Sequence, residues 1–188
     1  MTADLRARLA DAHAEFDRRV RAVPPDGWAR PSPCPDWTVR DVINHVVYEN
    51  RWAPHLLRGE SLESVGDAYD GDLLGDDPVG SWVAAAQGCR DQVAQTPLDA
   101  TFTASFDEIS VDFYLRQLIA EHLVHAWDVA RGAGGDEALD PAFVDEIAAW
   151  FADYEDYYRE IGVTGPRPEV AGSADAQTRL LAAFGRAV

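Results

Sequence analysis

The stretch SVDFYLRQLIAEHLVHAWDVARGAGG, residues 110–135, decides the fold because its apolar residues recur at the period of a helix. This pattern predicts a helix over residues 110–131, which the glycines of GAGG end. Glu121, His122 and His125 interrupt the apolar pattern. On a helical wheel, His122 falls near the middle of the apolar arc, whereas Glu121 and His125 fall together near one edge. The apolar arc consists of Val111, Leu115, Leu118, Ile119 and Val129.

The helical period dominates the rest of the chain as well. It predicts helices over residues 3–23, 39–58, 78–96 and 141–161, and a short last helix over residues 174–184. Thr38 and Asp41 resemble a capping box before the second helix, and Pro54 is expected to kink or shorten its end. Residues 59–76 read as a loop, and ATFTASF, residues 100–106, is the one predicted strand. We therefore expect an all-α helical bundle with irregular loops and a short C-terminal helix, in a single domain over residues 1–188.

Composition narrows the choice of partners and compartment. Sixteen Lys and Arg residues stand against 33 Asp and Glu residues, a formal charge of −17. This charge repels phosphate backbones and anionic headgroups, so we expect neither nucleic acid nor membrane partners. The chain contains no apolar run of the roughly 20 residues that a membrane span needs, and its N-terminus lacks a signal-peptide pattern. We expect a cytoplasmic protein in which Cys34 and Cys89 are reduced.

Two predicted helices carry pairs of metal-ligand residues at a spacing of four. Glu121 and His125 form one pair and His45 and Glu49 the other, and each pair lies beside an apolar stripe. Metal sites in helical bundles use carboxylates and imidazoles that project inward from facing helices. His122 is also a geometric candidate. These ligand types suit zinc, nickel, iron or manganese, but the same residues are also typical of hydrogen-bonded core positions or solvated charges.

Three motifs resemble a known family. They are PSPCPDWTVRDVINHVV at residues 31–47, EHLVHAWDVARG at residues 121–132 and the closing TRLLAAFGR at residues 178–186. Together they resemble the DinB/YfiT-like superfamily, and more closely its actinobacterial branch, which includes the N-terminal domain of mycothiol-dependent maleylpyruvate isomerase. The resemblance implies an up-down four-helix bundle that holds a divalent metal, most simply zinc. Carried over position by position, it implies the ligands His45, Glu121 and His125.

The resemblance also implies an activity. Characterised relatives use the metal to hold or activate a low-molecular-weight thiol, mycothiol, for transfer to or isomerisation of a small electrophile. Glu49 and Arg51 are then candidate catalytic residues that handle a proton or an anion. The alternatives are metal-assisted hydrolysis, a metal- or ligand-binding module without turnover, and a bundle that has lost its metal. A fourth ligand, Glu49 or His122, would favour the binding module.

One further stretch bears on assembly. WFADYEDYYRE, residues 150–160, places aromatic residues at helical spacing. Such a stripe is typical of a core or a dimer face, so a homodimer is possible on this pattern.

Overall fold

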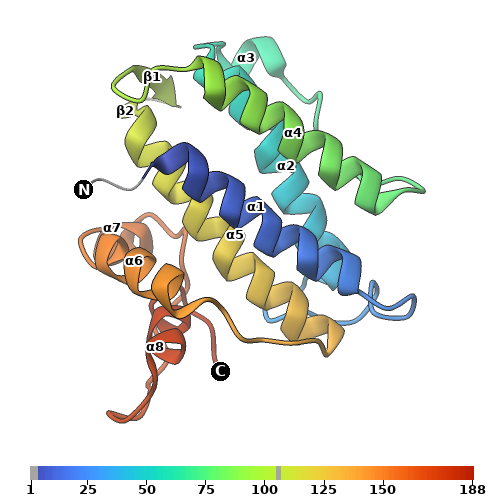
Figure 1. Cartoon of the computed structure of the whole chain (residues 1–188), viewed down its shortest axis with the longest axis vertical. Coiled ribbons are helices and arrows are strands. Elements are labelled where there is room, and N and C mark those ends of the chain that lie inside the picture. The colour runs from blue at the N-terminus through green and yellow to red at the C-terminus, as the bar shows by residue number, and fades with distance from the viewer. Residues whose placement is uncertain (1–3, 105–106) are drawn as a thin grey trace.

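Four long helices build the centre of the molecule, as the computed structural model shows (Figure 1). The structure describes residues 4–104 and 107–188. The bundle consists of α1 (Leu5–Ala22), α2 (Val39–Leu57), α4 (Pro78–Gln95) and α5 (Val111–Ala133). Each of these helices packs against two of the others, in the cyclic order α1, α5, α2, α4. The predicted all-α fold is therefore confirmed, and the predicted helix boundaries agree within a few residues. Residue 3, where the first helix was predicted to start, lies outside the described residues.

The connection between α2 and α4 runs back along the bundle, so these two helices point in the same direction (Figure 1). At the end of α2, Arg58 donates a hydrogen bond to Gln92 near the end of α4. The returning connection contains the short helix α3 (Leu62–Val65), within a segment that was predicted to be a loop. The helix α5 runs opposite to α2, and this brings the early turns of α2 beside the late turns of α5.

The predicted strand belongs to a two-stranded hairpin. Strand β1 (Thr101–Ala104) pairs antiparallel with β2 (Asp107–Ser110), and Phe102 lies opposite Ile109. The prediction missed β2, because DEIS lacks an alternating apolar pattern and its pairing with β1 defines it as a strand. Residues 105 and 106, the end of the predicted strand, lie outside the described residues.

The C-terminal third of the chain packs beside α5 (Figure 1). The prediction of one continuous helix over residues 141–161 was wrong. The segment forms two helices, α6 (Pro141–Phe151) and α7 (Glu155–Glu160). The break lets Phe151 pack against both Tyr158 and Phe184, with a ring separation of 3.9 Å to Phe184. The last helix, α8 (Ala176–Ala183), packs on α6. These elements supply a second wall beside the bundle.

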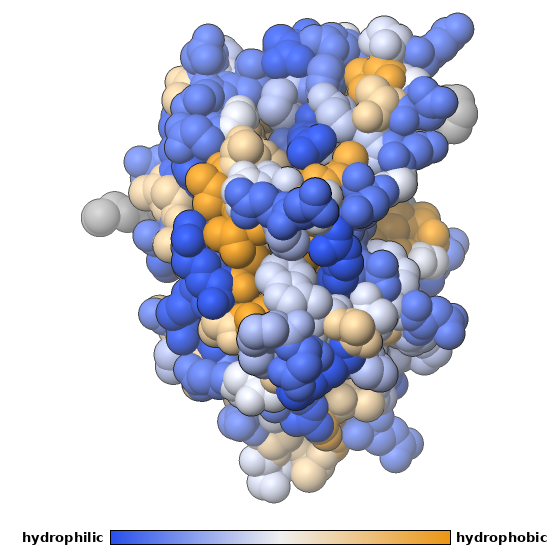
Figure 2. Space-filling view, turned by 90° about the vertical axis from the view of Figure 1, so that its right-hand side faces the viewer, coloured by the Kyte–Doolittle hydropathy of each residue, from blue (hydrophilic) through white to orange (hydrophobic). Residues whose placement is uncertain are grey.

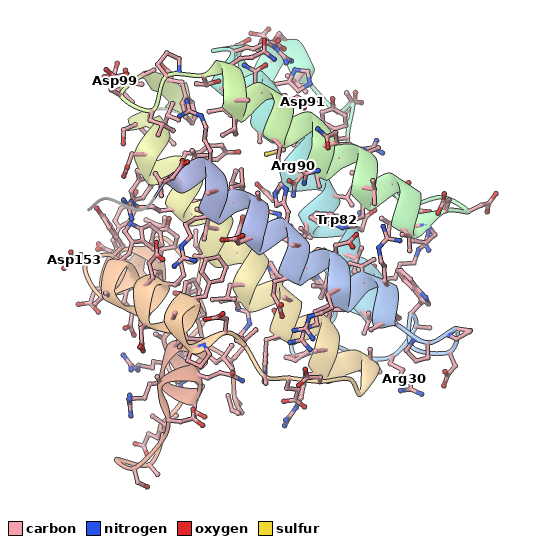
Figure 3. The ribbon with its side chains drawn as sticks, in the orientation of Figure 1. Arg30, Trp82, Arg90, Asp91, Asp99 and Asp153 are labelled. Atoms are coloured by element: carbon pink, nitrogen blue, oxygen red, sulfur yellow. The ribbon has the colours of Figure 1, made fainter. Side chains whose placement is uncertain are left out.

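Polar side chains tie α4 to α1 at the edge of the core. Trp82 donates its indole N–H to Asp17, and Arg90 donates to His13 Nδ1 (Figure 3). On the face shown in Figure 2, polar residues dominate and apolar residues form a broken band. Among the described residues, no helix combines the length and apolar character that crossing a membrane requires.

Candidate metal centre

Three predicted ligands meet between α2 and α5. His45 lies in the second turn of α2, and Glu121 and His125 lie one turn apart on α5. One potential ligand atom from each side chain lies within 4.8 Å of the other two. His45 Nε2 is 3.8 Å from Glu121 Oε1, and the rings of His45 and His125 are 5.2 Å apart. The structure thus brings His45 beside Glu121 and His125, which lie 76 and 80 positions later in the sequence.

The start of α2 is fixed locally, which positions His45. The Thr38 side chain accepts from the backbone N–H of Asp41, and the Asp41 carboxylate accepts from the backbone N–H of Thr38. This is the predicted capping box, with Asp in place of Glu. Residues 31–38 close on themselves through a bridge between Pro31 and Thr38. They approach α5 at Gly132, where a Cβ atom would lie only 3.0 Å from the Pro31 carbonyl oxygen and 2.7 Å from the side chain of Val39 at the start of α2.

Charge couples His45 to Glu121. Burial disfavours the imidazolium of His45, but the carboxylate of Glu121 more than offsets this and raises the pKa of His45. Burial likewise opposes the ionised form of Glu121, yet His45 lowers the pKa of Glu121. At 3.8 Å the contact is an ion pair rather than a hydrogen bond. A metal ion at this position would replace the proton of His45, so metal binding should release a proton.

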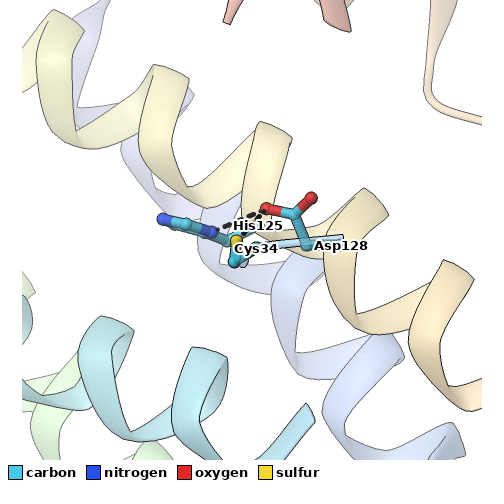
Figure 4. Close-up of side chains that lie close together, drawn as sticks. All are labelled: Cys34, His125 and Asp128. Atoms are coloured by element: carbon cyan, nitrogen blue, oxygen red, sulfur yellow. Dashed lines mark hydrogen bonds and ion pairs between the residues drawn. The ribbon is translucent and has the colours of Figure 1, made fainter. Parts of the chain in front are cut away.

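Asp128 lies beside His125 and orients its ring (Figure 4). Asp128 is fully buried, and its Oδ2 accepts from His125 Nδ1 over 2.9 Å. This bond leaves His125 Nε2 as the nitrogen free for a metal, the arrangement that metal-ligating histidines usually have. Asp128 thus connects a predicted ligand histidine with Arg186 near the C-terminus.

Arg186 balances the charge of Asp128. Its guanidinium donates to Asp128 Oδ2 over 2.8 Å and to Asp128 Oδ1 over 3.2 Å. Burial raises the pKa of Asp128, but His125 and Arg186 together lower it to about 2. Asp128 and Arg186 are 58 residues apart, and no local sequence pattern predicts that they form a pair. Arg186 belongs to the closing motif TRLLAAFGR, but the sequence did not indicate its role.

Cys34 completes this group (Figure 4). Its Sγ lies 3.3 Å from Asp128 Oδ2 and 3.3 Å from an Arg186 nitrogen. Burial, with the nearby Asp128 charge, raises the pKa of Cys34 to about 12, so its thiol stays protonated at neutral pH. Cys34, His125 and Asp128 also lie close enough together to hold an ion. The Arg186 cation already supplies the positive charge there, which disfavours a second one.

His122 points into the core and is engaged at both nitrogens. Its Nδ1–H donates to the Leu118 carbonyl over 2.6 Å, and its Nε2 accepts from Asn50 over 2.8 Å. Burial lowers the pKa of His122 to about 4, so the ring is neutral. Packed against the rings of His13 and Trp82, it has no nitrogen left for a metal.

The two predicted catalytic residues, Glu49 and Arg51, lie outside the cavity that the three predicted ligands line. Burial, followed by the charge of Glu121, raises the pKa of Glu49. Arg51 donates to the Leu73 carbonyl over 3.4 Å and lies over the Tyr69 ring. Neither residue is among the described residues that line the cavity beside the ligands.

That cavity has a volume of about 530 Å³, and all three predicted ligands line it. Pro33, Cys34, Pro35 and Trp37 of the first connection form one wall, and the C-terminal third of the chain forms another. Trp37 is one of these wall residues and packs on His45 with the rings 5.1 Å apart. Gln117, Tyr158, Thr164 and Arg186 also line the cavity, and sequence reasoning did not assign them to the site.

The chemistry of the three predicted ligands suits a divalent ion. Glu121 Oε2 is buried and has no hydrogen-bond partner among the described residues. A buried carboxylate oxygen without a partner is costly, and a cation would satisfy it. Two imidazoles and a carboxylate are also a donor set that zinc accepts.

Comparison with known proteins identifies the family of this chain. A family model described as the mycothiol maleylpyruvate isomerase N-terminal domain matches residues 9–130. The chain belongs to this family. The matched region of the mycothiol maleylpyruvate isomerase N-terminal domain family contains His45, Glu121, His125 and Asp128, and it ends before α6.

Two curated relatives in Mycobacterium tuberculosis share the chain's sequence to a similar degree. They are uncharacterized protein MT0763 of strain CDC 1551 and uncharacterized protein Rv0738 of strain H37Rv. Each is 30% identical over 151 residues, which covers 76% of this chain and 73% of the relative. No solved structure gives a significant match. Family membership thus supports the DinB-like bundle, and the relatives' printed names assign no activity.

Proposed function

We propose that the protein binds one divalent metal ion through His45, Glu121 and His125 and acts as a thiol-dependent transferase or isomerase on a small electrophile. Zinc is the proposed ion and mycothiol the proposed thiol. The observation that carries the proposal is the position of the three ligands on the wall of a cavity of about 530 Å³. Three protein ligands beside a cavity leave a coordination position for a small molecule, as catalytic zinc sites require.

A bound divalent ion would supply Lewis acidity, which lowers the pKa of a thiol held beside it. The chain's own residues supply the rest. Asp128 holds His125 in the tautomer whose Nε2 faces the ion, and Arg186 keeps Asp128 ionised. Trp37 and the C-terminal wall restrict water around the site. Glu49, with its raised pKa, is proposed to hold a proton near His45.

The proposed transfer is a substitution at the electrophilic carbon. The thiol sulfur forms a bond to the electrophilic carbon, the thiol proton passes to a base, and the leaving group departs with the electron pair of the broken bond. In an isomerisation the sulfur adds to the carbon and is later expelled, so the thiol is regenerated. The ligand set also suits hydrolysis by a water in place of the thiol, but the family description favours the thiol.

A metal-binding module without turnover is the alternative from another class. It would be favoured by a fourth protein ligand that closes the site. His122, one of the two candidates for that position, donates and accepts its hydrogen bonds elsewhere. This arrangement supports an open site.

Thiol binding to a cobalt(II)-substituted protein tests the proposal. Mycothiol should produce a sulfur-to-cobalt charge-transfer absorption band that saturates below millimolar thiol, on the order of an ordinary substrate affinity. The His125→Ala variant should give no band, and the Asp112→Asn variant, changed on the exposed face of α5, should behave like the parent protein. If cobalt binds but no band appears at millimolar mycothiol, the thiol-dependent function is wrong.

A further inference from the structure

The cavity beside the proposed metal centre has mostly apolar walls. Ala120 and Val124 of α5 face it from the bundle. The opposite wall comes from the C-terminal third of the chain, which lies outside the matched family region. The apolar residues of that wall are Trp150, Tyr158, Val163, Pro166 and Phe184. A ligand seated here gains affinity mainly by burying carbon.

The cavity offers no unpaired cation among the described residues. Arg186 is the one Arg or Lys that lines it, and all three of its guanidinium nitrogens already donate to protein acceptors. They donate to both carboxylate oxygens of Asp128, to the Phe184 carbonyl and to the Cys34 sulfur. Glu121 contributes a negative charge to the same cavity. A carboxylate that entered it would lose its water and find only cations that are already paired with carboxylates, Arg186 with Asp128 and His45 with Glu121, which is costly.

The cavity does offer neutral hydrogen-bonding groups. Thr164 is only 7% exposed, and its hydroxyl is buried without a hydrogen-bond partner among the described residues. Gln117 Oε1 accepts from the Tyr158 hydroxyl over 3.0 Å. Its Nε2 makes no hydrogen bond to the described part of the chain, so its two N–H groups are available to a ligand.

We propose that this cavity binds an uncharged electrophile with an apolar body about the size of one aromatic ring. A carbonyl or hydroxyl group of this molecule hydrogen-bonds to Thr164 and Gln117. The inference rests on the proposed function, in which a thiol occupies the open position of the metal and the electrophile lies in the cavity. Dicarboxylate electrophiles are poor ligands for this site, because the ion can accept one anionic group and the walls can accept none.

Matched neutral and anionic ligands test the inference. Calorimetric titrations would compare cinnamamide with cinnamate, which share a body and differ in charge. They would be run on the protein as purified and after chelation removes the metal, because cinnamate can itself bind a metal. We expect cinnamamide to bind the metal-depleted protein at least about tenfold more tightly than cinnamate, the factor that 1.4 kcal/mol represents.

A pair of threonine variants tests the polar contact. Thr164→Val keeps the shape of the side chain and removes the hydroxyl, and should weaken cinnamamide about fivefold, the effect of one neutral hydrogen bond. Thr103→Val, on the hairpin away from the cavity, should leave the affinity unchanged. Equal or tighter binding of cinnamate to the metal-depleted protein, no binding of either compound, or an unchanged Thr164→Val affinity would overturn the inference. Elemental analysis of the same samples reports separately whether the proposed metal site has failed.

Discussion

Replacing Asp128 by asparagine should damage the metal centre without touching a proposed ligand. Asp128 is fully buried and accepts from His125 over 2.9 Å and from Arg186 over 2.8 and 3.2 Å. The substitution removes the charge that holds the His125 ring and stabilises the imidazole as a ligand. Losing such a partner weakens metal binding by about 10- to 100-fold. Competition with a zinc-binding dye at pH 7 measures this affinity directly.

The same variant should also lose stability. Breaking a buried ion pair costs about 3–5 kcal/mol, and asparagine keeps one oxygen as an acceptor, so we expect the lower end of this range in metal-free protein. Urea unfolding measures the loss. Asp112→Asn is the matched control on the same helix, because Asp112 is half exposed and its pair with Arg116 contributes at most about 1 kcal/mol.

A double variant separates the two effects. In Asp128→Asn/Arg186→Met the unpaired cation is gone, so part of the stability should return while the zinc affinity stays low. The reasoning would be refuted if Asp128→Asn bound zinc within about twofold of the parent protein, or if the double variant recovered the affinity together with the stability.

Two further predictions concern the buried histidines. His122→Gln should lower the free energy of unfolding by about 2 kcal/mol, because the substitution disturbs a buried hydrogen bond with Asn50. The metal content should stay unchanged. Loss of metal from a folded variant would show that His122 is a ligand. Burial, with the nearby Arg90 charge, lowers the pKa of His13, so the unfolded chain takes up a proton below about pH 6.5 that the folded protein does not. The stability contribution of neutral His13 is therefore complete above pH 6.5 and falls by up to about 1.4 kcal/mol per pH unit below it. Urea unfolding from pH 7 to pH 5 should show a shallower pH dependence for His13→Gln than for the parent protein, and an identical dependence would contradict the assignment.

The helices of the bundle were predictable because their apolar period and their caps are local. The capping box before α2 and the glycines after α5 mark helix ends in the sequence itself. The break between α6 and α7 was not predictable, since no Pro or Gly marks it. It arises from distant packing, in which Tyr154 contacts Phe113 and Phe151 stacks on Phe184.

Part of the candidate site could likewise be predicted from the sequence, and part of it could not. Spacing placed Glu121 and His125 on one helix edge, and the family resemblance selected them with His45. The wheel also placed His122 toward the core, where the structure finds it. Two features depend on how the residues after α8 pack beside α5. One is the ion pair between Asp128 and Arg186, and the other is the C-terminal wall of the cavity. No local pattern encodes that contact, so sequence reasoning offered Arg51 as the cation while the fold brings Arg186 to the cavity.

Elemental analysis of protein purified without a histidine tag shows whether His45, Glu121 and His125 hold a metal ion. We expect about one equivalent of a divalent metal in the parent protein and in His122→Gln. We expect loss of that metal from His125→Ala and from Glu121→Gln, with circular dichroism showing that both variants remain helical. A parent protein with far less than one equivalent, or a His125→Ala variant that keeps its metal, would contradict the account.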